Sequence, residues 1–281
     1  MDHDMELPRE MRDLEDRARR RETPCGDGHI AWRLWGEGEP VVLLHGGSGS
    51  WTHWLRNIPA VVGAGRMAVV PDLPGFGESS VPPGGGDADA VVAPVAEGLA
   101  RLVGERPVDI VAFSFGSLVA ALLASQMPQR VSRLLLVGAP VVPLQRGRGV
   151  DLKPWSLSST PQERLRIHRH NLGAIMLHQP QAIDDVALSL QAHNVTRDRM
   201  RRRRLVTTPA FQEAIRGFQC PFSAIYGGED VLMDGLWPQV KAALCANPRF
   251  GGMTVIPDTG HWVQFEAAER FNEAMLSALA A

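Results

Sequence analysis

The chain has 281 residues, of which 44% are hydrophobic and 21% charged, and its formal net charge is −2. These values are ordinary for a globular protein and give no reason to expect nucleic acid or an acidic membrane as a partner. No apolar run approaches the roughly 18–20 residues that cross a bilayer. The first residues have no apolar core after their charges, so we expect no secretory signal.

Three cysteines, Cys25, Cys220 and Cys245, show no C-x-x-C spacing, and their odd number argues against a disulfide framework. We expect packed or idle thiols in a reducing cytoplasm. The sequence suggests no metal site and no cofactor.

Residues 1–24 carry many charges of both signs and few apolar side chains, which indicates an extension that forms a loosely held helix or stays disordered. Residues 29–35 then alternate apolar and polar side chains, as a half-exposed antiparallel strand does. Four short apolar runs follow and predict buried strands of a parallel sheet: residues 41–44, 67–70, 108–113 and 131–137. We expect helices between them: residues 52–62, 88–103 and 115–124.

The pattern changes after the strand at 131–137. Residues 140–217 contain no convincing strand, but three segments have helical character: residues 161–177, 183–194 and 197–206. The alternation then resumes with strands and helices: residues 222–226, 237–246, 253–256 and a last amphipathic helix that ends near Leu279. We therefore predict a core of residues 25–139 and 218–281, interrupted by a helical insertion at 140–217.

One serine marks a sharp turn between a strand and a buried helix, in the stretch VDIVAFSFGSLVAALLA at residues 108–124. The pattern AFSFG around Ser114 resembles the G-x-S-x-G "nucleophile elbow" of α/β-hydrolases, with Ala112 in place of the first glycine. Ser114 could instead cap the helix that follows. Its place between two phenylalanines at a strand–helix turn favours a nucleophile.

A glycine-rich stretch, HGGSGS at residues 45–50, follows the strand at 41–44. Glycines at a strand end let backbone N–H groups point into a cavity. The stretch resembles the HG-x-G loop of α/β-hydrolases; a phosphate-binding turn is the alternative, but the G-x-G-x-x-G spacing and the Walker lysine are missing. The resemblance implies an oxyanion hole made by the N–H of Phe115 and that of Gly47 or Ser48. The string D-x-P-G-x-G-x-S at residues 72–79, also common in that family, looks structural.

A serine nucleophile needs an imidazole base, which a carboxylate orients, and in this fold the chain order is Ser, Asp or Glu, then His. The turn GGEDV at residues 227–231 resembles the G-x-x-D turn of the family and makes Asp230 the candidate acid. Gly-His after the strand at 253–256 makes His261 the candidate base. Other acids compete with Asp230: Glu229, Asp234 and Asp258. Of the other histidines, His45 lies at a parallel strand end, where the family keeps a histidine that is not the base.

Over residues 28–279 the chain resembles a serine α/β-hydrolase. This resemblance implies the α/β-hydrolase fold, a mostly parallel central sheet flanked by helices, with residues 140–217 as a helical lid after the sixth strand. The motif GHWVQFE at residues 260–266 is similar to the closing motif of meta-cleavage-product hydrolases, which cut C–C bonds in vinylogous diketo acids. Those enzymes usually carry Asn before the nucleophile and Gly-Gly after its following residue, where this chain has Phe113 and Gly116-Ser117.

The substrate pocket is expected between the elbow and the lid. Several aromatic residues near the motifs would make it apolar, although each could equally be core: Trp51, Trp54, Phe113, Phe115 and Trp262. Residues 197–204 hold six arginines, which form the solvated face of a lid helix or contribute one side chain that binds a substrate carboxylate. Nucleic-acid binding fits this run less well, because no basic field surrounds it.

These residues predict a serine hydrolase that cleaves a carboxylic ester or related carbonyl compound through an acyl-enzyme. C–C hydrolysis of the meta-cleavage-product type is the alternative, and acyl transfer or perhydrolysis stays open. A non-catalytic small-molecule-binding homologue would be expected to have a broken triad, whereas this chain has all three candidates. Epoxide hydrolases and haloalkane dehalogenases share the fold but need Asp in place of Ser114. The expected partner is an apolar or aromatic small molecule, with no nucleic acid and no membrane, and a homodimer is left open.

Overall fold

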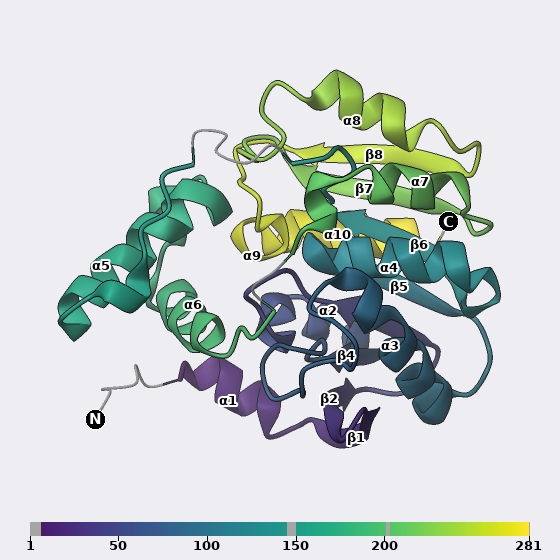
Figure 1. Ribbon diagram of the computed structural model, residues 1–281, viewed down its shortest axis with the longest axis horizontal. Coiled ribbons are helices and arrows are strands. Elements are labelled where there is room, and N and C mark those ends of the chain that lie inside the picture. Colours follow the sequence, from purple (N-terminus) through teal and green to yellow (C-terminus); the bar gives the residue numbers. More distant parts are fainter. Residues whose placement is uncertain (1–6, 145–149, 201–202, 281) are drawn as a thin grey trace.

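The computed structural model describes residues 7–144, 150–200 and 203–280. Its strands form one sheet in the order β1-β2-β4-β3-β5-β6-β7-β8 (Figure 1). The strands are β1 (Arg19–Cys25), β2 (Gly28–Trp35), β3 (Pro40–Leu44), β4 (Met67–Pro71), β5 (Val108–Phe113), β6 (Val131–Val137), β7 (Phe222–Gly227) and β8 (Phe250–Ile256). β2 is antiparallel to both β1 and β4, and all the other pairs are parallel, which gives the predicted α/β-hydrolase sheet.

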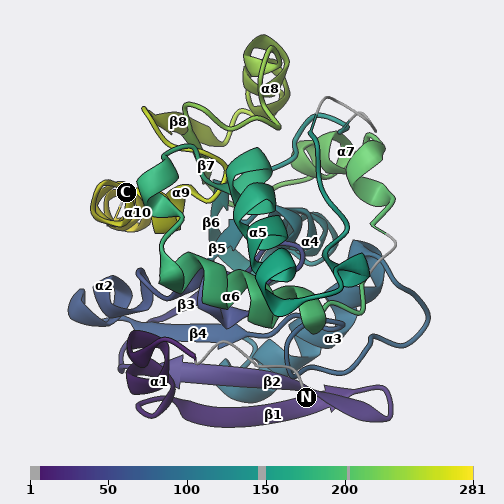
Figure 2. The ribbon, with the colours of Figure 1, turned by 90° about the vertical axis from the view of Figure 1, so that its left-hand side faces the viewer.

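Helices cover both faces of this sheet (Figures 1 and 2). They are α1 (Arg9–Glu15), α2 (Ile58–Gly63), α3 (Ala88–Val103), α4 (Phe115–Gln126), α5 (Pro161–Asn171), α6 (Asp185–Thr196), α7 (Ala210–Arg216), α8 (Trp237–Leu244), α9 (Val263–Glu266) and α10 (Ala268–Ala280). Successive residues of β3 point to opposite faces: Val42 and Leu44 pack in a cluster with α3 and α4, and Val41 and Leu43 pack in another with α2 and α10. Burial on both faces explains why these strands are continuous apolar runs.

The sheet begins earlier than the sequence suggested. β1 starts at Arg19 and pairs with β2 from Arg19 opposite Leu34 to Cys25 opposite Gly28. Its first four side chains are exposed and charged, as is common on an edge strand. The composition of the segment therefore resembles that of a solvated extension. The prediction of a loosely held extension over residues 1–24 is therefore wrong for residues 19–24, and α1 also buries Met11 in the core. Residues 1–6 lie outside the described part of the chain.

The segment between β6 and β7 is helical, as predicted. Its described residues form α5, α6, α7 and short turns, and none of them is in a strand. Figure 2 shows α5 in front of the middle of the sheet and α6 lower, in front of β3, and Figure 1 shows both helices to one side of the sheet. α6 is tied to the core by Asn194, whose amide donates to Thr52 Oγ1 at 3.0 Å. We call residues 140–217 the helical insertion; its role as a lid stays a prediction, and residues 145–149 and 201–202 lie outside the described part.

The predicted helix at residues 197–206 is wrong for the residues that are described. Arg197 caps the end of α6, and the Asp198 carboxylate then accepts the Met200 N–H at 2.9 Å. The Arg199 N–H donates to Gly75 O at 2.9 Å, outside the segment. These backbone groups bond to a side chain and to a distant turn, so a helical ladder does not form; only a 3₁₀ turn follows at Leu205–Thr207. The helix predicted at residues 52–62 is likewise split into a 3₁₀ turn, Trp51–Trp54, and α2.

Candidate active site

Ser114 lies at the turn between β5 and α4 with φ 49° and ψ −113°, a backbone conformation that costs a non-glycine residue about 1–3 kcal/mol. Its N–H donates to Val137 O on the neighbouring strand at 2.8 Å, which holds the turn. A Cβ at Gly116 would lie 2.5 Å from the His45 carbonyl oxygen, so glycine is required there. Ala112, by contrast, is an ordinary buried residue of β5, and its methyl group is accommodated. The elbow therefore forms without the first glycine of the motif.

The structure brings together the three residues predicted for the triad. His261 Nε2 lies 2.9 Å from Ser114 Oγ, and His261 Nδ1 lies 2.7 Å from Asp230 Oδ2. Asp230 and His261 are 1% and 3% exposed. The Leu232 N–H donates to the other carboxylate oxygen of Asp230 at 3.0 Å and fixes its orientation. With the proton on Nδ1 shared with Asp230, Nε2 is free to accept the serine hydroxyl.

Tyr226 lies on β7, the strand that leads to Asp230, and is fully buried. Its hydroxyl donates to Ala139 O at 2.9 Å. Burial, and then the nearby charge of Asp230, raises the pKa of Tyr226 far above its ordinary value. The phenol therefore stays neutral and adds no second negative charge beside the triad.

The HGGSGS loop is held by two buried, neutral histidines. His45 Nε2 accepts the Leu73 N–H at 2.8 Å and its Nδ1 donates to Gly46 O at 2.8 Å, while burial lowers the pKa of His45. His53 Nδ1 accepts the Gly46 N–H at 3.2 Å. Gly46 packs on the elbow, since a Cβ there would lie 3.2 Å from Ser114 Cβ. The loop thus lies beside the nucleophile, and the backbone N–H groups of Gly47, Ser48 and Phe115 stay the predicted oxyanion donors.

Two residues of the helical insertion, Asp198 and Arg203, contact the HGGSGS loop. Ser48 Oγ donates to Asp198 Oδ2 at 2.6 Å, and Arg203 Nη2 lies 2.7 Å from the same oxygen and 3.1 Å from Ser48 Oγ. A Cβ at Gly47 would lie 1.9 Å from Arg203 Nη1, so the guanidinium rests on the glycine itself. One arginine of the run at residues 197–204 therefore lies at the site and is not part of a solvated face.

Residues 41–274 match a sequence profile of the alpha/beta hydrolase family. The chain belongs to this family. It is 27% identical over 260 residues to the 2-hydroxy-6-oxo-6-phenylhexa-2,4-dienoate hydrolase of Burkholderia cepacia, covering 87% of this chain and 89% of that protein. It is 26% identical over 272 residues, with the same two coverages, to the 2-hydroxy-6-oxononadienedioate/2-hydroxy-6-oxononatrienedioate hydrolase of Comamonas testosteroni.

Solved structures of similar fold include enzymes with different activities. The meta-cleavage product hydrolase of Pseudomonas fluorescens IP01 is 22% identical with a TM-score of 0.73, covering 92% of this chain and 97% of that one. A thermophilic esterase of Thermogutta terrifontis is 21% identical with a TM-score of 0.73, covering 94% and 98%. At these identities the likeness shows the fold; together with the family match and the curated relatives, it identifies the chain as an α/β-hydrolase enzyme.

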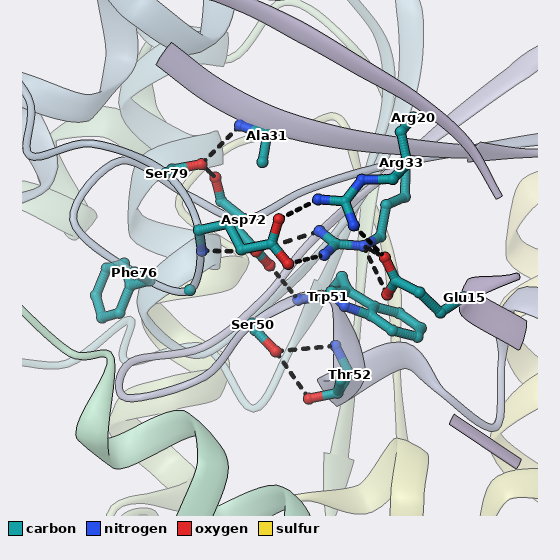
Figure 3. A network of polar contacts seen from close by, with 12 residues as sticks. Glu15, Arg20, Ala31, Arg33, Ser50, Trp51, Thr52, Asp72, Phe76 and Ser79 are labelled. Carbon is teal, nitrogen blue, oxygen red and sulfur yellow. Dashed lines mark hydrogen bonds and ion pairs between the residues drawn. The ribbon is translucent and has the colours of Figure 1, made fainter. Parts of the chain in front are cut away.

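The turn after β4 connects the glycine-rich loop of the hydrolase to the N-terminal part of the sheet (Figure 3). Asp72, which is 1% exposed, accepts the Trp51 N–H at 2.9 Å and the Glu78 N–H at 3.0 Å. It also lies 3.2 Å from Arg33 Nη1, and Arg33 in turn contacts Glu15 of α1. Burial alone would lower the pKa of Arg33, but Asp72, Glu15 and Glu78 together raise it. The predicted structural role of the turn is seen in these bonds.

Of the five aromatic residues expected near the pocket, Phe113 and Trp262 contact imidazoles of the hydrolase, whereas the Trp54 ring packs against Phe271 and the Phe115 ring against Phe76. The Phe113 ring lies 4.9 Å from the His261 ring and 5.5 Å from the His53 ring, and the Trp262 ring lies 4.9 Å from the His53 ring. Trp51 makes different ring contacts, with its ring 5.4 Å from that of Trp35 and 5.2 Å from the Arg33 guanidinium. Trp51 therefore supports the packing under α1, and nothing places it at Ser114.

The sequence did not predict three residues of the site: His53, Asp198 and Glu266. The Glu266 carboxylate accepts the N–H of Gly260, next to His261, at 2.6 Å. His53 is 3% exposed, and burial, followed by the nearby His45 and His261, lowers its pKa well below the ordinary value. His53 lies in a 3₁₀ turn between Trp51 and Trp54 and does not follow a strand, so its position in the sequence did not suggest a role at the site. For Glu266 a signal existed, because it closes the GHWVQFE motif.

The described residues hold no group of three or more histidines, cysteines or acids that could bind a metal ion. Cys25 and Cys220 are buried, Cys245 is exposed, and all three are free thiols. In the same part of the chain no helix is long and apolar enough to cross a membrane.

Proposed function

We propose that this α/β-hydrolase cleaves a carboxylic ester or a related carbonyl compound through an acyl-serine intermediate. The observation that carries the proposal is the continuous chain of contacts from Ser114 Oγ through His261 to Asp230, at distances of 2.9 and 2.7 Å. The strained turn at Ser114 supports it, because such strain persists where the surrounding structure enforces it and is concentrated at functional sites.

In this mechanism Ser114 Oγ attacks the carbonyl carbon while His261 Nε2 takes the hydroxyl proton. The N–H groups of Phe115 and of Gly47 or Ser48 stabilise the negative charge on the carbonyl oxygen. The tetrahedral intermediate collapses, the bond to the leaving alcohol breaks, and the imidazolium returns its proton to that alcohol. Water then attacks the acyl-serine with His261 as base, which releases the acid and restores Ser114.

The rings of Phe113 and Trp262 favour an apolar or aromatic acyl group, because both lie against the imidazoles of the site. Such a small molecule is the partner we propose. Neither a nucleic acid nor a membrane is needed for this chemistry.

C–C bond hydrolysis of a keto acid is the second candidate, and Arg203 is the observation that favours it. Its guanidinium rests on Gly47, where it could bind a substrate carboxylate. The curated relatives named above are hydrolases of dienoates and dienedioates, which carry carboxylates. Phe113 and Gly116-Ser117 differ from the usual residues of that class, so the ester remains our first candidate.

An active-site fluorophosphonate and a substrate panel test both candidates. Wild-type protein should label and Ser114→Ala should not; failure of the wild type to label would overturn the acyl-serine route. The panel compares p-nitrophenyl esters of increasing chain length with dienoic diketo acids.

Arg203→Gln separates the two candidates, with Arg204→Gln as the matched control on an exposed neighbour. If Arg203 binds a carboxylate, kcat/KM should fall at least about tenfold for keto acids and little for neutral esters. Equal losses on both substrates would show that Arg203 only holds the loop.

A further inference from the structure

Glu266, the last residue of α9, holds three backbone N–H groups with one carboxylate. Its Oε2 accepts the N–H of Gly260 at 2.6 Å and that of His178 at 3.2 Å, and its Oε1 accepts the N–H of Gln179 at 2.5 Å. Gly260 directly precedes His261, whereas His178 and Gln179 belong to the helical insertion. One side chain therefore joins the loop of the proposed base to the insertion.

The same two segments also contact each other through their backbones. The Trp262 N–H donates to Met176 O at 2.7 Å, so His261 is flanked by contacts on both sides. A Cβ at Gly260 would lie 2.8 Å from His178 N and 2.9 Å from Met176 O. Glycine is needed for this close approach, and the loop of the base cannot shift without moving the insertion.

The carboxylate is well suited to this position because neither segment is regular at the contact. Residues 258–262 follow β8 as a turn, and residues 177–179 follow the π-helical turn at Leu172–Met176. The N–H groups of Gly260, His178 and Gln179 therefore have no acceptor in a helix or strand ladder and need another one. An ionised acceptor makes shorter and stronger hydrogen bonds than a neutral one.

We propose that Glu266 is a positioning residue that couples the helical insertion to His261. This inference rests on the proposed function, since it assigns how the base of that mechanism is held. Among the described residues, Glu266 has no hydrogen bond to Ser114, Asp230 or the His261 ring; it acts through Gly260 on the distance between His261 Nε2 and Ser114 Oγ. Displacement of the insertion at residues 176–179 then carries the base away from the nucleophile.

Two substitutions of Glu266 and one control test this coupling. Glu266→Gln keeps one acceptor oxygen and the side-chain size, Glu266→Ala removes the acceptor, and Glu269→Gln changes an exposed acid on α10. The readouts are the rate constant of fluorophosphonate labelling of Ser114 and the downfield proton resonance of the His261 Nδ1–H. A slight misplacement of a catalytic group can cost about 10²-fold in rate. We expect labelling to slow about tenfold in Glu266→Gln and more in Glu266→Ala, with the resonance broadened, and Glu269→Gln to match the wild type.

A purely structural role gives a different result. Glu266→Gln would then lower the free energy of unfolding but label within about twofold of Glu269→Gln and keep the resonance, which would overturn the proposal. If Glu266→Ala does not fold, Glu266→Gln decides alone. Failure of wild-type protein to label would count against the proposed function, while the His261 resonance would still test the coupling.

Discussion

Glu15 links the N-terminal helix to the framework of the site, and its replacement by glutamine tests that link. Glu15 is the last residue of α1, and its two carboxylate oxygens lie 2.8 and 2.9 Å from Arg33 Nε. Arg20 Nη1 also lies 2.9 Å from Glu15 (Figure 3). Arg33 is 2% exposed, and through Asp72 it is connected to the backbone at Trp51, where the glycine-rich loop ends.

The expected loss of stability in Glu15→Gln follows from the hydrogen-bonding groups that glutamine retains. It retains the size of the side chain and one acceptor oxygen, so Arg33 exchanges a charged partner for a neutral one at a cost of about 1 kcal/mol. The Arg20 side chain is half exposed, and its pair with Glu15 contributes about 0.5 kcal/mol. Glu15→Gln should therefore lower the free energy of unfolding by about 1.5 kcal/mol. Glu15→Ala, which leaves a buried cation with one partner fewer, should lower it by about 3 kcal/mol.

Urea denaturation measures these changes, with Glu10→Gln as the matched control on the exposed face of the same helix. The control should change the free energy of unfolding by less than about 0.5 kcal/mol. If Glu15→Gln differs from Glu10→Gln by less than about 0.5 kcal/mol, α1 does not hold the buried arginine and the reasoning is refuted.

Four further substitutions probe other parts of the molecule. Asp230→Asn should slow fluorophosphonate labelling by about 10³–10⁴-fold, because an amide neither fixes the right tautomer nor stabilises the imidazolium; a loss under about tenfold would point to another acid. His168 has no hydrogen-bond partner for either ring nitrogen among the described residues, and burial lowers its pKa to about 4. Between pH 6.5 and 4 the unfolded chain binds a proton that the folded chain does not, so stability falls as the pH falls, by at most about 3 kcal/mol. His168→Phe should reduce this slope in urea unfolding at about pH 7.5 and pH 5, and an unchanged slope would contradict the assignment. Gly116→Ala should cost about 3 kcal/mol or more through the clash with His45 O, whereas Ala112→Gly should leave the labelling rate within about twofold; equal behaviour of the two variants would refute the roles given to these positions.

The sequence predicted the sheet and the convergence of Ser114, Asp230 and His261, because both follow from the order of apolar runs and motifs along the chain. Buried strands such as β3 and β5 are continuous apolar runs, and the carboxyl ends of parallel strands meet at one edge. Ser114, Asp230 and His261 each follow a parallel strand, so their order along the chain was enough to predict that they converge.

The remaining features depend on contacts between distant segments. β1 is charged because it is an edge strand, and local composition alone made it look like a solvated extension. Arg203 reaches Ser48 across 155 residues, and Glu266 reaches Gln179 across 87. The sequence does not show which acid or arginine contacts a residue so far away along the chain. Arg203 could therefore not be told apart from the other five arginines of its run, and Glu266 was noted only as part of a motif.

Both halves of the proposed catalytic machinery are held by bonds to the helical insertion. Asp198 holds Ser48 of the glycine-rich loop, and Glu266 fixes the loop of His261 to residues 178 and 179. Neither contact survives if the insertion moves away from the sheet, because in each case one partner belongs to the insertion and the other to the core. In the conformation described here, the insertion therefore holds both the loop predicted to supply oxyanion donors and the loop of His261. We expect substrates that prop the insertion open to react slowly even when their carbonyl group is intrinsically reactive, so the insertion limits substrate size through catalysis as well as through binding.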